Sequence, residues 1–152
     1  MRHPTLRKLW LAFLASKVAY LAFAFTLGPT GQPSEPEVVR PLFLTLAAVC
    51  AAIAVGTHIY RRRFLVAPIQ AGLLDPNTPE GFAKMFRPFI LILALTESIS
   101  IYGLVLAFIS RQPLMCLPFV IPAFVLMYLH RPTAPDLSPP TTSGVYRPPP
   151  LS

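Results

Sequence analysis

Long runs of apolar residues separated by short polar stretches dominate the chain. A transmembrane helix needs about 20 predominantly apolar residues, and four runs meet or approach that length. The runs cover residues 9–27, 41–60, 88–110 and 114–129. The last run is short and contains Pro118 and Pro122, so we expect it to be kinked or to lie shallow in the bilayer. The pattern predicts an all-α integral membrane protein with four transmembrane helices.

The segments outside these runs are polar and rich in helix-breaking residues. Residues 61–87 are interpreted as a cytoplasmic loop, although FLVAPIQAGLL at 64–74 could lie in the membrane interface as an amphipathic segment. From residue 131 onward the chain contains seven prolines, a composition typical of disordered or polyproline II segments. We therefore expect a membrane domain at residues 1–130 and a disordered Pro-rich tail at 131–152.

The distribution of basic residues predicts the orientation of the four helices. The chain is 54% apolar and only 12% charged, with a formal net charge of +7. With four spans, ten basic residues fall on the side of the termini and two on the other. The first group is Arg2, Arg7, Lys8, Arg61, Arg62, Arg63, Lys84, Arg87, Arg131 and Arg147, and the second is Arg40 and Arg111. The positive-inside rule then places both termini in the cytoplasm.

This charge pattern also suggests the location and the partners. Basic loops facing an anionic leaflet explain the positive charge of such an apolar chain better than nucleic-acid binding does. We expect a multi-pass protein of a bacterial inner (cytoplasmic) membrane. The triplet Arg61–Arg63 is interpreted as a topology anchor, with anionic-lipid binding as the alternative.

Glu97 is the most informative polar residue. It lies nine residues after Pro88, about 13 Å into the bilayer at the helical rise and close to the midplane of a core about 30 Å thick. An ionised carboxylate at that depth is costly, so Glu97 is expected to be either protonated or paired. Ser98, Ser100 and Tyr102 are candidate hydrogen-bonding neighbours.

Lys17 is a candidate partner for this acid. It lies eight residues into the first run, at a depth of about 12 Å from the same side. Equal depth permits an ion pair between Lys17 and Glu97, which would keep Glu97 ionised and count against ion carriage. Alternatively, the lysine extends towards the interface or stays neutral.

Residues 79–110 carry a resemblance to a known family. The stretch ALTESISIYGLVLAF at 94–108, preceded by NTPEG at 77–81, resembles the outer helix and cytoplasmic turn of the c subunit (proteolipid) of rotary ATP synthases. The resemblance implies that Glu97 reversibly binds a proton or Na⁺, with Ser98 and Tyr102 assisting. The inner-helix carboxamide or acid that Na⁺ binding requires is missing from residues 41–60, which favours a proton.

Two functions follow from these observations. The first is a proteolipid-like protein with an intramembrane proton-binding site at Glu97, Ser98, Ser100 and Tyr102, belonging to or derived from an ion-translocating assembly. The second is a non-enzymatic structural or accessory membrane protein whose buried Glu97 stabilises helix packing. Partners would be the bilayer and either further copies of the chain or other membrane subunits. The sequence has no GxSxG, P-loop, HExxH or GxGxxG motif, so no enzyme activity, metal or cofactor is expected.

Overall fold

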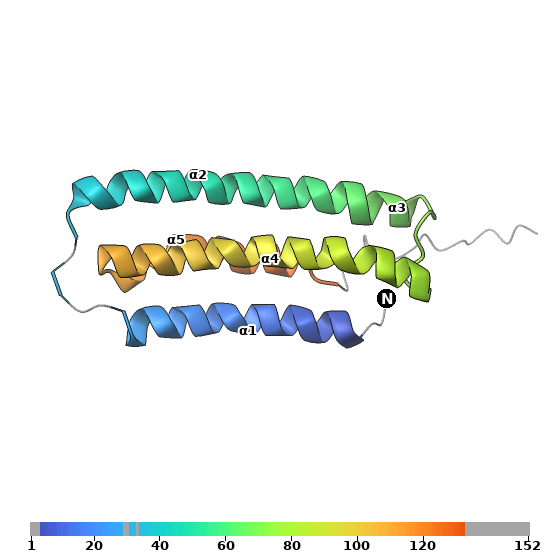
Figure 1. Ribbon diagram of the computed structural model, residues 1–152, viewed down its shortest axis with the longest axis horizontal. Helices are drawn as coiled ribbons and strands as arrows, with labels where there is room; N and C mark the ends of the chain where they lie inside the picture. The colour runs from blue at the N-terminus through green and yellow to red at the C-terminus, as the bar shows by residue number, and fades with distance from the viewer. Residues whose placement is uncertain (1–3, 29–30, 33, 133–152) are drawn as a thin grey trace, which may run out of the picture.

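The computed structural model describes residues 4–28, 31–32 and 34–132. These residues form helices and turns, with no strand among them. The helices are α1 (Pro4–Thr26), α2 (Pro36–Arg61), the π-helical turn η1 (Arg62–Val66), α3 (Ala67–Gln70), α4 (Pro79–Ser110), the 3-10 turn η2 (Pro113–Cys116) and α5 (Leu117–Leu129). Successive long helices alternate in direction (Figure 1). The predicted disordered tail lies outside the described residues, apart from its first two.

Three helices are long and apolar enough to cross a membrane. They are α1 with 23 residues, the continuous rod of α2, η1 and α3 with 35 residues, and α4 with 32 residues. At about 1.5 Å per residue each exceeds the hydrocarbon core of about 30 Å. The fourth predicted run forms the shorter apolar helix Pro113–Leu129, which starts as a 3-10 turn and contains Pro122 inside α5. The predicted all-helical fold is therefore confirmed for the described residues, with three helices that could span a membrane.

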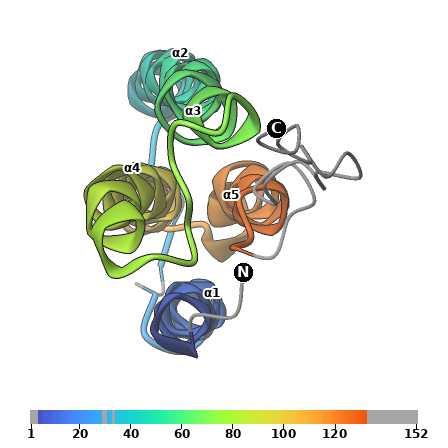
Figure 2. The same cartoon turned by 90° about the vertical axis from the view of Figure 1, so that its right-hand side faces the viewer.

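Helix α4 is the most buried of the three long helices. Half of its most apolar stretch is buried, against 11% for the corresponding stretches of α1 and α2. Viewed along the bundle, α4 lies next to α1, α2 and α5 (Figure 2). Gly103 allows one of these contacts, because a Cβ atom there would lie 2.7 Å from Cβ of Phe119. The bare glycine lets α4 and α5 approach closely.

The connection between the second and third runs is shorter than the sequence predicts. Helix α2 continues through η1 into α3, with Pro68 near the start of α3, where a proline is tolerated. Leu65 and Ile69 are buried in the core of the bundle, so this segment packs as a continuation of α2 and not as a separate amphipathic helix. Helix α4 begins nine residues early, at Pro79, because the Thr78 hydroxyl caps it by accepting a bond from the Gly81 N–H at 3.1 Å.

Candidate functional site: a buried ion pair between α1 and α4

Lys17 and Glu97 meet in the middle of the bundle, at the contact between α1 and α4. The Lys17 Nζ atom lies 2.7 Å from Oε2 of Glu97, and the two side chains are 0% and 10% exposed. The lysine is therefore fully enclosed, with its ammonium group bonded inside the bundle. The ion pair that the equal depths of Lys17 and Glu97 permit is therefore present in the structure.

Further hydrogen bonds complete the surroundings of both charges. The second carboxylate oxygen of Glu97, Oε1, accepts a bond from the Ser16 hydroxyl. The Lys17 ammonium also donates to the Ser100 hydroxyl at 3.4 Å. The Tyr20 hydroxyl, one turn along α1, interacts with the same carboxylate. Both carboxylate oxygens thus have partners, which is the arrangement that makes a buried charge tolerable in a low-dielectric interior.

The four residues predicted to bind a proton do not all come together. Ser100 lies one turn from Glu97 and takes part in the site. Ser98 instead donates to the backbone carbonyl of its own helix at Leu95, 2.7 Å away. Tyr102 packs among apolar residues on the side of α4 that faces α2. Of the predicted helpers, only Ser100 contacts the ion pair.

Sequence reasoning missed Ser16 and Tyr20, which come from α1. Both lie close to Lys17 in sequence, Ser16 directly before it and Tyr20 three residues after it. Residues three or four apart share a helix face, so the polar pattern Ser16, Lys17, Tyr20 was the available signal. It indicates a polar patch on an otherwise apolar helix, and that patch is the side of α1 that meets Glu97.

The arrangement is suited to holding two helices together. Within the described ranges, no group of three His, Cys, Asp or Glu side chains lies close enough to hold a metal ion. Cys50 and Cys116 are both buried as free thiols. The polar side chains at the α1–α4 contact bond to one another. The site therefore joins a cation on α1 to an anion on α4.

Comparisons with known proteins add no relative. No family model, curated protein or solved structure matches the chain. The likeness of residues 79–110 to the proteolipid family stays a prediction made from those residues.

Proposed function

We propose that this chain is a non-enzymatic structural or accessory membrane protein whose Lys17–Glu97 ion pair fastens α1 to α4. The observation that carries the proposal is the buried contact of 2.7 Å between the two charges. A cation held against the carboxylate occupies the place that an exchanging proton would need. The pair therefore supports a fixed helix contact more strongly than ion carriage.

The weak burial of α1 explains why such a contact is useful. In lipid, apolar side chains gain little by leaving the hydrocarbon, so packing and polar contacts drive the association of helices. Only 11% of the most apolar stretch of α1 is buried. Its polar contacts with the rest of the bundle include the ion pair and a 2.8 Å bond from Trp10 Nε1 to the Met127 carbonyl of α5. These contacts define how α1 sits on its neighbours.

The proposed topology has four spans with both termini in the cytoplasm of a bacterial cell. The basic clusters support it, because the beginning of α1, the end of α2 and the beginning of α4 lie at one end of the bundle (Figure 1). Arg62 and Arg63 are exposed there, and anionic lipid headgroups are their natural ligands. Other subunits or further copies of the chain would bind the lipid-facing sides of the helices.

Proton binding at Glu97, as in a proteolipid-like subunit, is the second candidate. Two observations favour it: the ALTES–IYG pattern around Glu97 and the burial of this acid in the middle of α4. It requires Lys17 to move away or lose its charge during each cycle.

Dicyclohexylcarbodiimide, which attacks protonated carboxyl groups in apolar surroundings, separates the two candidates. Purified protein is treated across mildly acidic to mildly alkaline pH, and the peptide containing Glu97 is analysed by mass spectrometry. We expect no modification of Glu97 in the native chain and clear modification in Lys17→Leu, where the unpaired acid must take up a proton to remain in hydrocarbon. Modification of the native chain that fades as pH rises would contradict the structural role and favour proton binding.

A further inference from the structure

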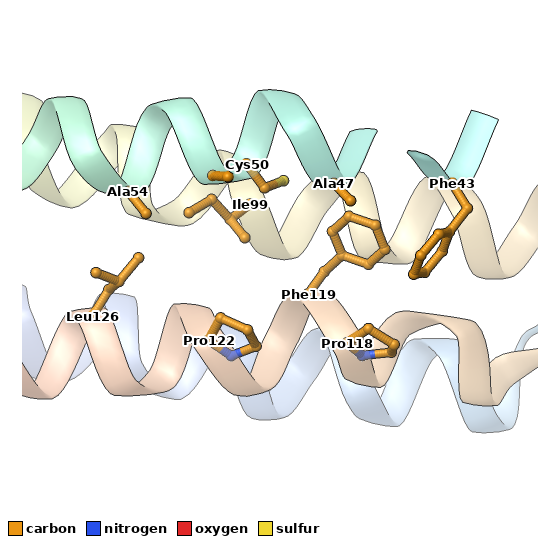
Figure 3. A pocket seen from close by; sticks show the side chains of 10 residues that line it. Phe43, Ala47, Cys50, Ala54, Ile99, Pro118, Phe119, Pro122 and Leu126 are labelled. Atoms are coloured by element: carbon orange, nitrogen blue, oxygen red, sulfur yellow. The ribbon is translucent and has the colours of Figure 1, made fainter. Parts of the chain in front are cut away.

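An apolar hollow lies between α2 and α5, on the side of the bundle away from α1. Its volume is about 230 Å³. Ala47 and Ala51 of α2 form one wall, Phe119 and Pro122 of α5 form the other, and Ile99 of α4 lies behind them. Figure 3 shows the α2 and α5 side chains facing each other across the gap. Small alanines on one helix and compact proline rings on the other leave the space unfilled.

A second hollow continues the first towards the end of the bundle where the α1–α2 connection lies. Its volume is about 340 Å³, and Phe43 lines both hollows. Unlike the first, it has polar groups at its rim, namely Ser34, Arg40 and Gln112. Arg40 is exposed, and no acidic side chain in the described part of the chain forms an ion pair with it. The two hollows together have an apolar interior and a mouth with one lining cation, Arg40, which lies one turn along α2 from the exposed Glu37.

We propose that the two hollows form a binding site for one glycerophospholipid of the leaflet at that end. The lipid phosphate would lie against the Arg40 guanidinium and the Gln112 amide, and one acyl chain would run past Phe43 between α2 and α5. A guanidinium presents paired donors that match phosphate oxygens. The site is independent of the ion pair and needs only that the chain is embedded in a bilayer.

The dimensions of the site fit this ligand. From Phe43 to Ala54 the wall formed by α2 is about 16 Å long at the helical rise, and one leaflet contributes about 15 Å of hydrocarbon, half of the bilayer core. Small-ligand pockets usually have about 300–1,000 Å³, so the apolar hollow of about 230 Å³ is narrow. A single hydrocarbon chain suits it better than a second helix about 10 Å across.

Photo-crosslinking in a phosphate-free detergent tests the proposal. The full chain in dodecyl maltoside is mixed with phosphatidylglycerol carrying a diazirine in one acyl chain, irradiated and analysed by mass spectrometry. We expect adducts to concentrate on residues 43–54 and 118–126. Ala51→Phe, which fills the hollow, should lower their yield about fivefold. Ala52→Phe is the matched control, because Ala52 is on the same helix and outside the lining.

A second pair of variants tests the headgroup contact. Arg40→Gln should lower the yield several-fold, whereas Arg111→Gln removes the same charge at the same end of the bundle without touching the lining. Diacylglycerol with the same diazirine chain lacks the phosphate and should label the groove weakly. Equal loss in Arg40→Gln and Arg111→Gln would overturn the assignment of the phosphate to Arg40.

Two further results would overturn the proposal. One is labelling that is spread evenly over the lipid-facing sides of all helices, with the same adduct yield in Ala51→Phe and Ala52→Phe. The other is a second copy of the chain in the groove. Cys50 lines the hollow, so a Cys116→Ala protein that forms Cys50–Cys50 dimers on mild oxidation would show that a helix of another copy fills it. We expect this variant to stay monomeric and to retain the lipid adducts.

Discussion

The α1–α4 and α2–α5 contacts pack helices in opposite ways. Between α1 and α4, a lysine and a glutamate are enclosed together with hydroxyl groups, and the contact is closed. Between α2 and α5, the facing side chains are apolar and a hollow of about 230 Å³ remains. In hydrocarbon an apolar gap can be filled by lipid at little cost, whereas an unpaired charge cannot be tolerated. The α1–α4 contact is therefore fixed by polar partners, whereas the α2–α5 contact leaves an apolar space between the helices.

The largest effect is expected from removing one charge of the closed contact. Lys17→Leu leaves Glu97 without its cation and should lower the free energy of unfolding by about 3 kcal/mol, the usual order for breaking a buried pair. Unfolding in mixed micelles with increasing dodecyl sulfate measures this change. Lys8→Leu is the matched control, because Lys8 is on the same helix and exposed. An equally small effect of both variants would remove the distinction between the two contacts.

Substitutions of two glycines test whether close approach of helices contributes as much to stability as the ion pair does. Gly103→Ala places a Cβ atom 2.7 Å from Cβ of Phe119 and 3.0 Å from the Cys116 carbonyl, and should cost about 2 kcal/mol through overpacking. Gly56→Ala meets nothing within 4 Å and should be neutral or slightly stabilising. The same unfolding assay compares them. Equal stability of the two variants would show that α4 and α5 pack less tightly than described.

Trp10 provides a smaller test of how α1 is held. Its Nε1–H donates to the Met127 carbonyl at 2.8 Å, and Trp10→Phe should cost about 1 kcal/mol, the net value of one hydrogen bond. The unfolding midpoint, followed by circular dichroism, measures the loss. A loss as large as that of Lys17→Leu would mean that the ion pair is not the main polar contact of α1.

The smallest effect is expected from the exposed pair Lys84–Glu80. The Lys84 Nζ atom lies 2.8 Å from Oε1 of Glu80, and the two side chains are 66% and 81% exposed. Lys84→Gln should leave the free energy of unfolding almost unchanged, because water screens exposed charges, and any small change should vanish at high salt. Comparison with Lys17→Leu separates the effect of enclosure from that of charge, because the N–O distances of the two pairs, 2.7 and 2.8 Å, are nearly equal.

The membrane-type fold could be predicted from hydropathy, but the helix ends could not. Three runs of about 20 apolar residues became helices of membrane length, because spanning demands little more than length and apolarity. The boundaries depend on local details. Pro68 and Pro79 are residues that usually interrupt helices. A proline in the first turn of a helix is nevertheless tolerated, so α3 extends to residue 70 and α4 begins at residue 79.

For the site, depth was informative and the neighbours of Glu97 along the chain were misleading. The sequence left Glu97 either protonated or paired and Lys17 either paired, extended to the interface or neutral, and equal depth made each the candidate partner of the other. Ser98 and Tyr102 lie about 100° and 140° around the helix from Glu97 at about 100° per residue, whereas Ser100 lies only about 60° away. The partners Ser16 and Tyr20 come from another helix, and only the packing of α1 on α4 brings them to the carboxylate.

A double-mutant cycle tests the ion pair as the fastener of α1 most directly. Lys17→Leu, Glu97→Leu and the double variant are unfolded under identical conditions. If the pair joins the two helices, the double variant should be more stable than the sum of the single losses allows, with a coupling free energy of about 2 kcal/mol or more. Losses that add within about 0.5 kcal/mol would show that the two charges do not act on one another.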